Sequence, residues 1–177
     1  LLLGSFLNVV VHRLPRRESI VSPRSRCTSC GALIRWYQNL PVVSYAALRG
    51  RCAGCGVSIS IRYPLIEVVA SLLLLVVWWR FGVSTSFFVF APFALAMLAL
   101  FAIDLEHQLL PDAITLPGTL LGLVVSPWNP HVTVLGAVLG AALGYGALWL
   151  LAEGYERFRG IAGLGGGDIK LAAMIGA

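Results

Sequence analysis

Long apolar segments separated by short polar ones dominate this chain. Apolar runs cover residues 65–79, 86–103, 113–125 and 132–152, and residues 1–11 have the character of the end of another. About 17–25 apolar residues make a helix that crosses the roughly 30 Å hydrocarbon core of a bilayer. The pattern therefore predicts a bundle of membrane-spanning helices, with a further helix starting near Ile169. The run at 113–125 is short for a crossing and is either a short span or a re-entrant segment.

The composition supports the same class of protein. Of 177 residues, 58% are hydrophobic and only 12% are charged, about half the charged share of an average soluble domain. We therefore expect an all-α polytopic membrane protein. The chain begins at Leu1 rather than at a methionine and ends shortly after a glycine-rich motif, so we also expect it to be truncated at both ends.

Basic residues are concentrated between residues 13 and 62, where nine arginines accompany a single acid, Glu18. Beside hydrophobic segments, such an island favours a loop that stays in the cytoplasm over a nucleic-acid-binding surface. If this loop is cytoplasmic, the 86–103 span brings Asp104 back to the cytoplasmic face. Two further crossings would bring Asp168 to the same face, provided that residues 113–125 cross the membrane.

The basic loop also contains all four cysteines, as two Cys-x-x-Cys pairs. Paired thiolates on glycine-assisted turns can close a tetrahedral Zn²⁺ site, and four thiolates leave no open position for catalysis. A structural zinc is favoured over disulfides or a thiol-redox pair, because the cytoplasm disfavours disulfides and a redox pair needs no matching second pair. The predicted zinc ligands are Cys27, Cys30, Cys52 and Cys55.

Three regions follow from these patterns. Residues 1–12 form the end of a first transmembrane helix, and residues 13–62 form a small cytoplasmic, zinc-ribbon-like insertion between the first two spans. Residues 63–177 form a transmembrane core that we expect to be incomplete at its C-terminus.

Two aspartates at membrane boundaries are candidates for catalysis. Asp104 ends a charge-free span, and Asp168 follows the glycine run 165–167 at the start of the last helix. Asp112 follows Pro111 and is better suited to starting a helix. Two neighbouring carboxylates cannot easily both ionise, so one keeps a proton while the other acts as a base toward water. Glycines would let a substrate backbone approach this acid pair, and Lys170 is expected to reach toward the membrane interface.

In their order and combination, these motifs resemble those of the type IV prepilin peptidases. The matching segments are residues 4–15 (GSFLNVVVHRLP), both cysteine pairs, residues 35–41 (RWYQNLP), residues 61–67 (IRYPLIE), Asp104 with residues 110–112 (LPD), and Gly165 to Asp168 followed by Lys170. The resemblance implies an intramembrane aspartic endopeptidase with Asp104 and Asp168 as its catalytic acids. It also implies removal of a basic leader peptide from prepilins or pseudopilins, after a glycine, at the cytoplasmic side of the bacterial inner membrane.

Bacterial members of that family also methylate the new N-terminus with S-adenosylmethionine. This second activity is implied by the resemblance alone, because no glycine-rich cofactor fingerprint is present and the cofactor-binding residues are unknown. The expected partners are thus pilin-type substrates and the lipid bilayer, with no nucleic acid. Two alternatives stay open at this point: a non-enzymatic scaffold that recruits a partner through its zinc ribbon, and a membrane thiol-redox relay.

Overall fold

The computed structural model describes residues 1–161 and 163–177, and this part of the chain contains helices, loops and two isolated β-bridges but no strand. The expectation of an all-α fold is therefore confirmed. The helices are α1 (Leu2–Arg13), α2 (Val43–Ala47), α3 (Arg62–Phe81), α4 (Thr85–His107), α5 (Asp112–Val125), α6 (Val134–Arg159) and α7 (Gly166–Gly176), with 3₁₀ turns η1 (Leu14–Arg16), η2 (Trp36–Asn39) and η3 (Ser126–Trp128).

Three of these helices, α3, α4 and α6, are long and apolar enough to cross a membrane. Side-chain oxygens cap two of them: Ser84 accepts a hydrogen bond from the Phe87 N–H at the start of α4, and Thr133 does the same for Gly136 at the start of α6. The predicted polytopic membrane fold is confirmed, with the cysteine-bearing loop between α1 and α3.

Helix boundaries differ from the apolar runs mainly at the polar ends. Helix α4 continues to His107, so Asp104 lies in its last turn, and α6 continues to Arg159. Polar residues such as Glu, Gln and Arg favour helix as much as most apolar ones do, so a helix can extend past its membrane-buried part. Helix α5 has 14 residues, which corresponds to about 21 Å and is short of a bilayer core.

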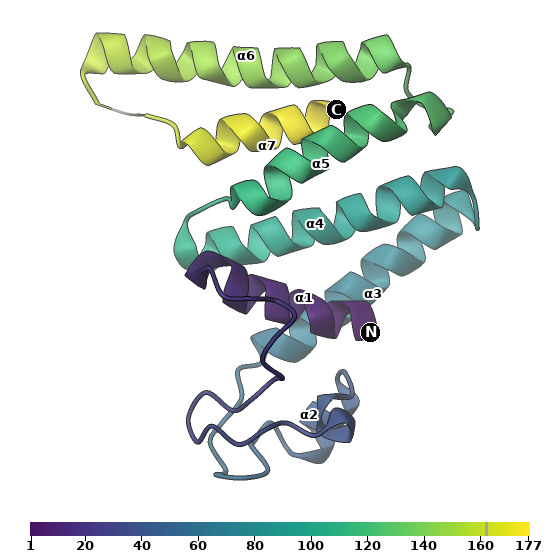
Figure 1. The fold of residues 1–177 in the computed structure, drawn as a ribbon, viewed down its shortest axis with the longest axis vertical. Coiled ribbons are helices and arrows are strands. Elements are labelled where there is room, and N and C mark those ends of the chain that lie inside the picture. The colour runs from purple at the N-terminus through teal and green to yellow at the C-terminus, as the bar shows by residue number, and fades with distance from the viewer. Residues whose placement is uncertain (162) are drawn as a thin grey trace.

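The helices run back and forth, so their connected ends gather at two sides of the bundle (Figure 1). On the left of Figure 1 lie the last turns of α1, α4 and α6 and the first turns of α5 and α7. This arrangement places the segments that contain Asp104 and Asp168 on one side, together with both attachment points of the cysteine-bearing loop.

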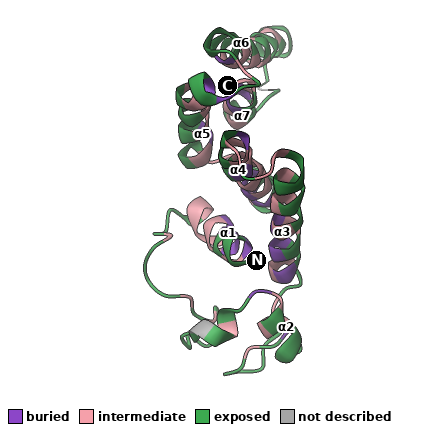
Figure 2. Ribbon diagram, turned by 90° about the vertical axis from the view of Figure 1, so that its right-hand side faces the viewer, coloured by how far each residue is buried: buried purple, intermediate pink, exposed green. Residues whose placement is uncertain are grey.

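Most buried residues lie where α1, α3 and α4 meet, whereas α6 is exposed along most of its length (Figure 2). The central cluster contains Leu7, Val11, Ile66, Ala99, Ala102 and Ile103. Helix α1 packs closely on α3 because Gly4 has no side chain: a Cβ there would lie 2.7 Å from the Cα of Glu67.

Glycines also bring α7 into direct backbone contact with α6. A Cβ at Gly140 would clash with the carbonyl oxygen of Gly176, and one at Gly144 would clash with that of Ala172. The sequence spacing of Gly136, Gly140 and Gly144 predicts such a packing face. The structure bears this out for Gly140 and Gly144, while Gly136 contacts the Thr133 cap instead.

We expect Gly144→Ala to destabilise the protein by about 1–3 kcal/mol, because its new methyl group would push α7 away from α6. Gly146→Ala is the matched control: it lies in the same helix, and a Cβ there would have no other atom within 4 Å. The measurement is the thermal unfolding midpoint in detergent. Equal midpoints for the two variants would contradict this account of the packing.

Candidate active site and metal centre

Asp104 projects from the last turn of α4 and is exposed. Its carbonyl oxygen accepts a hydrogen bond from the N–H of Gln108, whose left-handed φ of 50° ends the helix. The chain then passes through residues 109–111 into α5. The protein itself leaves Asp104 exposed, because this residue lies on the same face of α4 as the exposed Phe101 and Leu105 rather than on the buried face of Ile103.

Asp168 is also exposed and lies in the first turn of α7. Its carboxylate lies over Gly165, where a Cβ would be 3.1 Å from Oδ2 of Asp168. Gly167 faces the other motif, since a Cβ there would lie 2.8 Å from the Cβ of Leu110, whereas Gly166 has free space around it. The absence of a side chain at Gly167 thus lets the two aspartate-bearing segments come into contact.

An ion pair reinforces this contact between the two segments. The Nζ of Lys170 lies 2.7 Å from both carboxylate oxygens of Asp112 and donates hydrogen bonds to them. Lys170 therefore links the first turn of α7 to the first turn of α5, a contact that the sequence interpretation of this residue did not include. Asp112 starts α5 as expected, but its side chain makes this pair rather than a helix cap.

A second ion pair connects the α4 end to the cysteine-bearing loop. The guanidinium of Arg62, the first residue of α3, pairs with the carboxylate of Glu106, which lies two residues after Asp104. The same carboxylate lies 3.8 Å from Nε2 of His107. The last turn of α4 is thus tied to α3.

The two cysteine pairs form equivalent turns. In the first, the N–H of Cys27 donates to Ala32 and the N–H of Gly31 donates back to Cys27; the second repeats this pattern between Cys52, Val57 and Gly56. Gly31 and Gly56 have φ values of 71° and 72°, a left-handed conformation that favours glycine. An isolated β-bridge closes each turn, between Arg26 and Leu33 and between Arg51 and Ser58.

These turns bring the four sulfur atoms within 4.8 Å of one another, so the residues could hold a metal ion. The sulfurs of Cys27 and Cys55 are 3.9 Å apart, close to the roughly 3.8 Å edge of a tetrahedron with 2.3 Å metal–sulfur bonds. This donor set and geometry fit a tetrahedral metal such as zinc.

The pKa values of two of these thiols are shifted in opposite directions. Backbone N–H groups of Cys30 and Ser29 lower the pKa of Cys27 to about 6. The backbone at Val57 lowers the pKa of Cys55, but desolvation and its three neighbouring thiols outweigh this effect and raise it to about 11. A negative charge on one sulfur thus disfavours ionisation of its neighbours. A bound cation would stabilise all four thiolates and so lower the pKa of each thiol.

Sequence reasoning grouped the four cysteines correctly but missed the contacts that join the aspartate segments. The pairs Lys170–Asp112 and Arg62–Glu106 and the contact of Gly167 with Leu110 all bridge residues more than 40 positions apart. The sequence carried one signal for these ion pairs: isolated charged residues lie beside apolar helices, and such charges usually pair with an opposite charge.

Comparison with known proteins gives consistent matches along the chain. Residues 1–81 match the bacterial peptidase A24 N-terminal domain, and residues 91–177 match the type IV leader peptidase family. No solved structure matches the chain significantly.

Curated relatives named prepilin leader peptidase/N-methyltransferase align with the whole chain. The Pseudomonas putida protein is 46% identical and the Stutzerimonas stutzeri protein 40% identical, each with 69% of its own length covered. The Neisseria gonorrhoeae protein is 40% identical, with 70% covered. Because these identities span both matched regions, the chain belongs to the type IV leader peptidase family.

Proposed function

We propose that this chain is an intramembrane aspartic endopeptidase that removes the leader peptide from prepilins or pseudopilins after a glycine. The observation that carries the proposal is the contact of Gly167 with Leu110, which joins the segments of Asp104 and Asp168 at one end of the bundle. The relatives' name, prepilin leader peptidase/N-methyltransferase, supplies the substrate class. Family membership also disfavours the non-enzymatic scaffold and the redox relay.

In the proposed mechanism Asp104 and Asp168 act as an acid–base pair. The ionised carboxylate takes a proton from water, whose oxygen attacks the carbonyl carbon of the scissile bond, and the protonated carboxylic acid donates a hydrogen bond to the carbonyl oxygen. The tetrahedral intermediate then expels the amine, which takes up the proton that the carboxylate received from water. Both acids are exposed at the end of the bundle, where a substrate helix can reach them from the membrane.

We further propose that this end of the bundle faces the cytoplasm of a bacterial inner membrane. The nine arginines of residues 13–62 belong to the loop attached at this side, and such residues are retained on the cytoplasmic side of the membrane.

Replacing either proposed catalytic acid by its amide, as Asp104→Asn or Asp168→Asn, should reduce leader removal by more than about 10²-fold, because the amide cannot take up the water proton. The measurement is the rate of mass loss from a purified prepilin, with circular dichroism confirming that each variant is folded. Near-normal cleavage by either variant would remove that residue from the mechanism.

Asp112→Asn should have a smaller effect, about three- to tenfold on the cleavage rate, because it weakens the Lys170 pair without removing a catalytic group. The exchange Asp112→Lys with Lys170→Asp should recover part of that loss. Glu153→Gln is the control: it breaks an exposed ion pair with Arg157 in α6 and should leave cleavage unchanged. A loss for Asp112→Asn as complete as that for Asp104→Asn would make Asp112 a candidate catalytic acid.

Zinc is the metal that we propose for Cys27, Cys30, Cys52 and Cys55, with a structural role. Nearly all residues of the loop are exposed or half-buried, so it has little core of its own and metal binding would supply its folding energy.

Purified protein should therefore contain about one zinc per chain, and Cys52→Ser should lose most of it, because three thiolates close the tetrahedron poorly. Elemental analysis measures the metal, and limited proteolysis of residues 13–62 measures the order of the loop. Ser29→Ala, which removes a hydroxyl between two ligands, is the control and should retain zinc. Full zinc content in Cys52→Ser would contradict the four-cysteine site.

The relatives' name, which includes N-methyltransferase, also supports a second activity, N-methylation of the substrate. The family resemblance implies that the new N-terminus is methylated and that S-adenosylmethionine is the methyl donor. Both reactions act on the same residue of the substrate, and cleavage must come first because it releases the amine that is methylated.

A further inference from the structure

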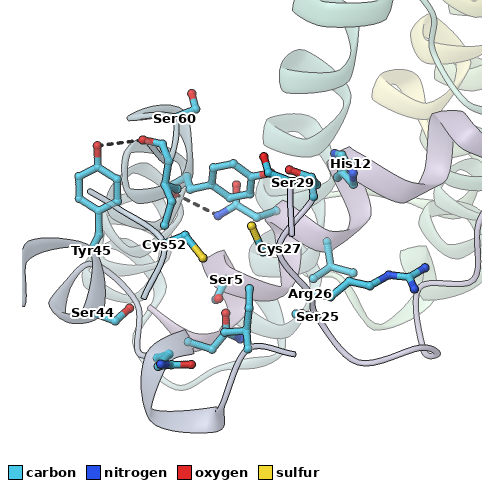
Figure 3. Close-up of a pocket in the computed structure, with 18 of the residues that line it drawn as sticks. Ser5, His12, Ser25, Arg26, Cys27, Ser29, Ser44, Tyr45, Cys52 and Ser60 are labelled. Atoms are coloured by element: carbon cyan, nitrogen blue, oxygen red, sulfur yellow. Dashed lines mark hydrogen bonds between the residues drawn. The ribbon is translucent and has the colours of Figure 1, made fainter. Parts of the chain in front are cut away.

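The cysteine-bearing loop is separated from α1 by a cleft but contacts the bundle at the start of α3. The cleft has a volume of about 1330 Å³, and Figure 3 shows His12 of α1 and Cys27 of the loop around it. Its lining includes Arg62, where the loop ends and α3 begins, and Glu106 of α4. The ion pair between these two side chains therefore joins the end of the loop to the turn of α4 that carries Asp104.

The start of α3 is itself held in place by α1. The side-chain amide of Asn8, a residue that is only 5% exposed, donates a hydrogen bond to the carbonyl oxygen of Tyr63 at 3.0 Å. The guanidinium carbon of Arg62 lies 5.5 Å from the centroid of the Tyr63 ring, a contact that favours a cation over the ring face. Arg62 thus presents its charge to Glu106 from a backbone that is fixed by a neighbouring helix.

Glu106 lies between two nitrogen-bearing side chains that are mostly buried. One of its carboxylate oxygens pairs with Arg62, and the other lies 3.8 Å from Nε2 of His107. These side chains are 25–33% exposed, against 77% and 40% for the Arg157–Glu153 pair. Nε of Arg62 and Nε2 of His107 are buried without a hydrogen-bond partner among the described residues. Loss of the Glu106 carboxylate would leave Arg62 partly buried without its counter-charge, which costs more than loss of an exposed pair.

The last turn of α4 is otherwise largely exposed. Ile103 is fully buried, whereas Leu105 is 70% exposed and the helix ends at Gln108 in a left-handed conformation. The last carbonyls of a helix have no partner within the helix, and helix ends fray for this reason. The pair of Glu106 with Arg62 therefore fastens to α3 a turn that would fray easily by itself.

Glu106 can fix this turn without occupying the face of α4 on which Asp104 lies. Side chains two residues apart on an α-helix differ in direction by about 200°, so Asp104 and Glu106 point to nearly opposite faces. Any effect of Glu106 on Asp104 is thus transmitted by the backbone of the turn, not by direct contact with a substrate.

We propose that Glu106 is a positioning residue, whose pair with Arg62 holds the last turn of α4 in the helical conformation that presents Asp104 to Asp168. The inference rests on the proposed function, in which Asp104 is a catalytic acid. Both acids must reach the same water and carbonyl group, and a displacement of about 1 Å can slow such a reaction by about 10²-fold. Because Arg62 ends the cysteine-bearing loop, the pair also links the order of that loop to the position of Asp104.

A double-mutant cycle on the full-length protein tests the pair. Arg62→Gln and Glu106→Gln should each lower kcat for prepilin cleavage about tenfold and change KM less than about twofold, because substrate still binds while Asp104 is displaced. The double variant should lose about tenfold, not the roughly hundredfold expected of independent sites. The matched controls are Arg24→Gln, an exposed loop arginine outside the cleft, and Glu156→Gln, an exposed acid in α6; both should leave kcat and KM unchanged.

Hydrogen–deuterium exchange reports on the turn without using activity. The amides of residues 104–108 should exchange about tenfold faster in Arg62→Gln and Glu106→Gln than in the wild type and both controls, at a temperature at which circular dichroism shows every variant to be folded. Zinc content equal to that of the wild type would exclude a change at the cysteines as the cause.

A pair that only stabilised the whole fold would lower the unfolding midpoint and leave kcat of the folded protein and local exchange unchanged. That result, or losses that add in the double variant, would overturn the proposal. The proposed function fails by a different result: near-normal cleavage by Asp104→Asn would remove Asp104 from the mechanism, even if exchange in the last turn of α4 responds to Glu106→Gln.

Discussion

The close backbone contact between α6 and α7 determines where Asp168 lies. The described part of α7, Gly166–Gly176, is held through Gly140 and Gly144 on α6 and through Gly118 on α5, which packs against Met174. In a bilayer such contacts depend on van der Waals packing, because lipid tails are as apolar as the side chains. The Lys170–Asp112 pair and the contact of Gly167 with Leu110 form only because α7 is held in this position.

The cysteine-bearing loop follows a different physical rule. It lies outside the apolar bundle, has little buried surface, and is ordered by two repeated turns that present four sulfurs to one point. Its remaining attachment to the bundle uses polar contacts: Arg62 with Glu106, and the N–H of Val42 with the buried carboxylate of Glu67. The helical bundle is thus stabilised by close packing. The loop instead contains a cluster of four cysteines that could bind a metal, and it contacts the bundle through an ion pair and a hydrogen bond.

Much of the fold was predictable from sequence, because apolar runs and cysteine spacing are local signals. The positions of α3, α4, α5 and α6 follow from such runs, and the grouping of Cys27, Cys30, Cys52 and Cys55 follows from matching turns. The role of Lys170 was not predictable, since its partner Asp112 lies 58 positions away and is found only once α5 and α7 are packed. For the same reason, sequence showed no cleft beside α1: its walls come from three separate segments.

The length of α6 has a consequence for how the protein sits in its membrane. Its 26 residues extend for about 39 Å, against a hydrocarbon core of about 30 Å, and its last turns carry the Glu153–Arg157 pair. A helix longer than the core tilts or projects by an amount set by the local bilayer thickness. Because α7 is packed against α6 through glycines, a change in tilt would move Asp168 with it. Lipid chain length would thereby act on the geometry of the two aspartates without any ligand binding to the protein.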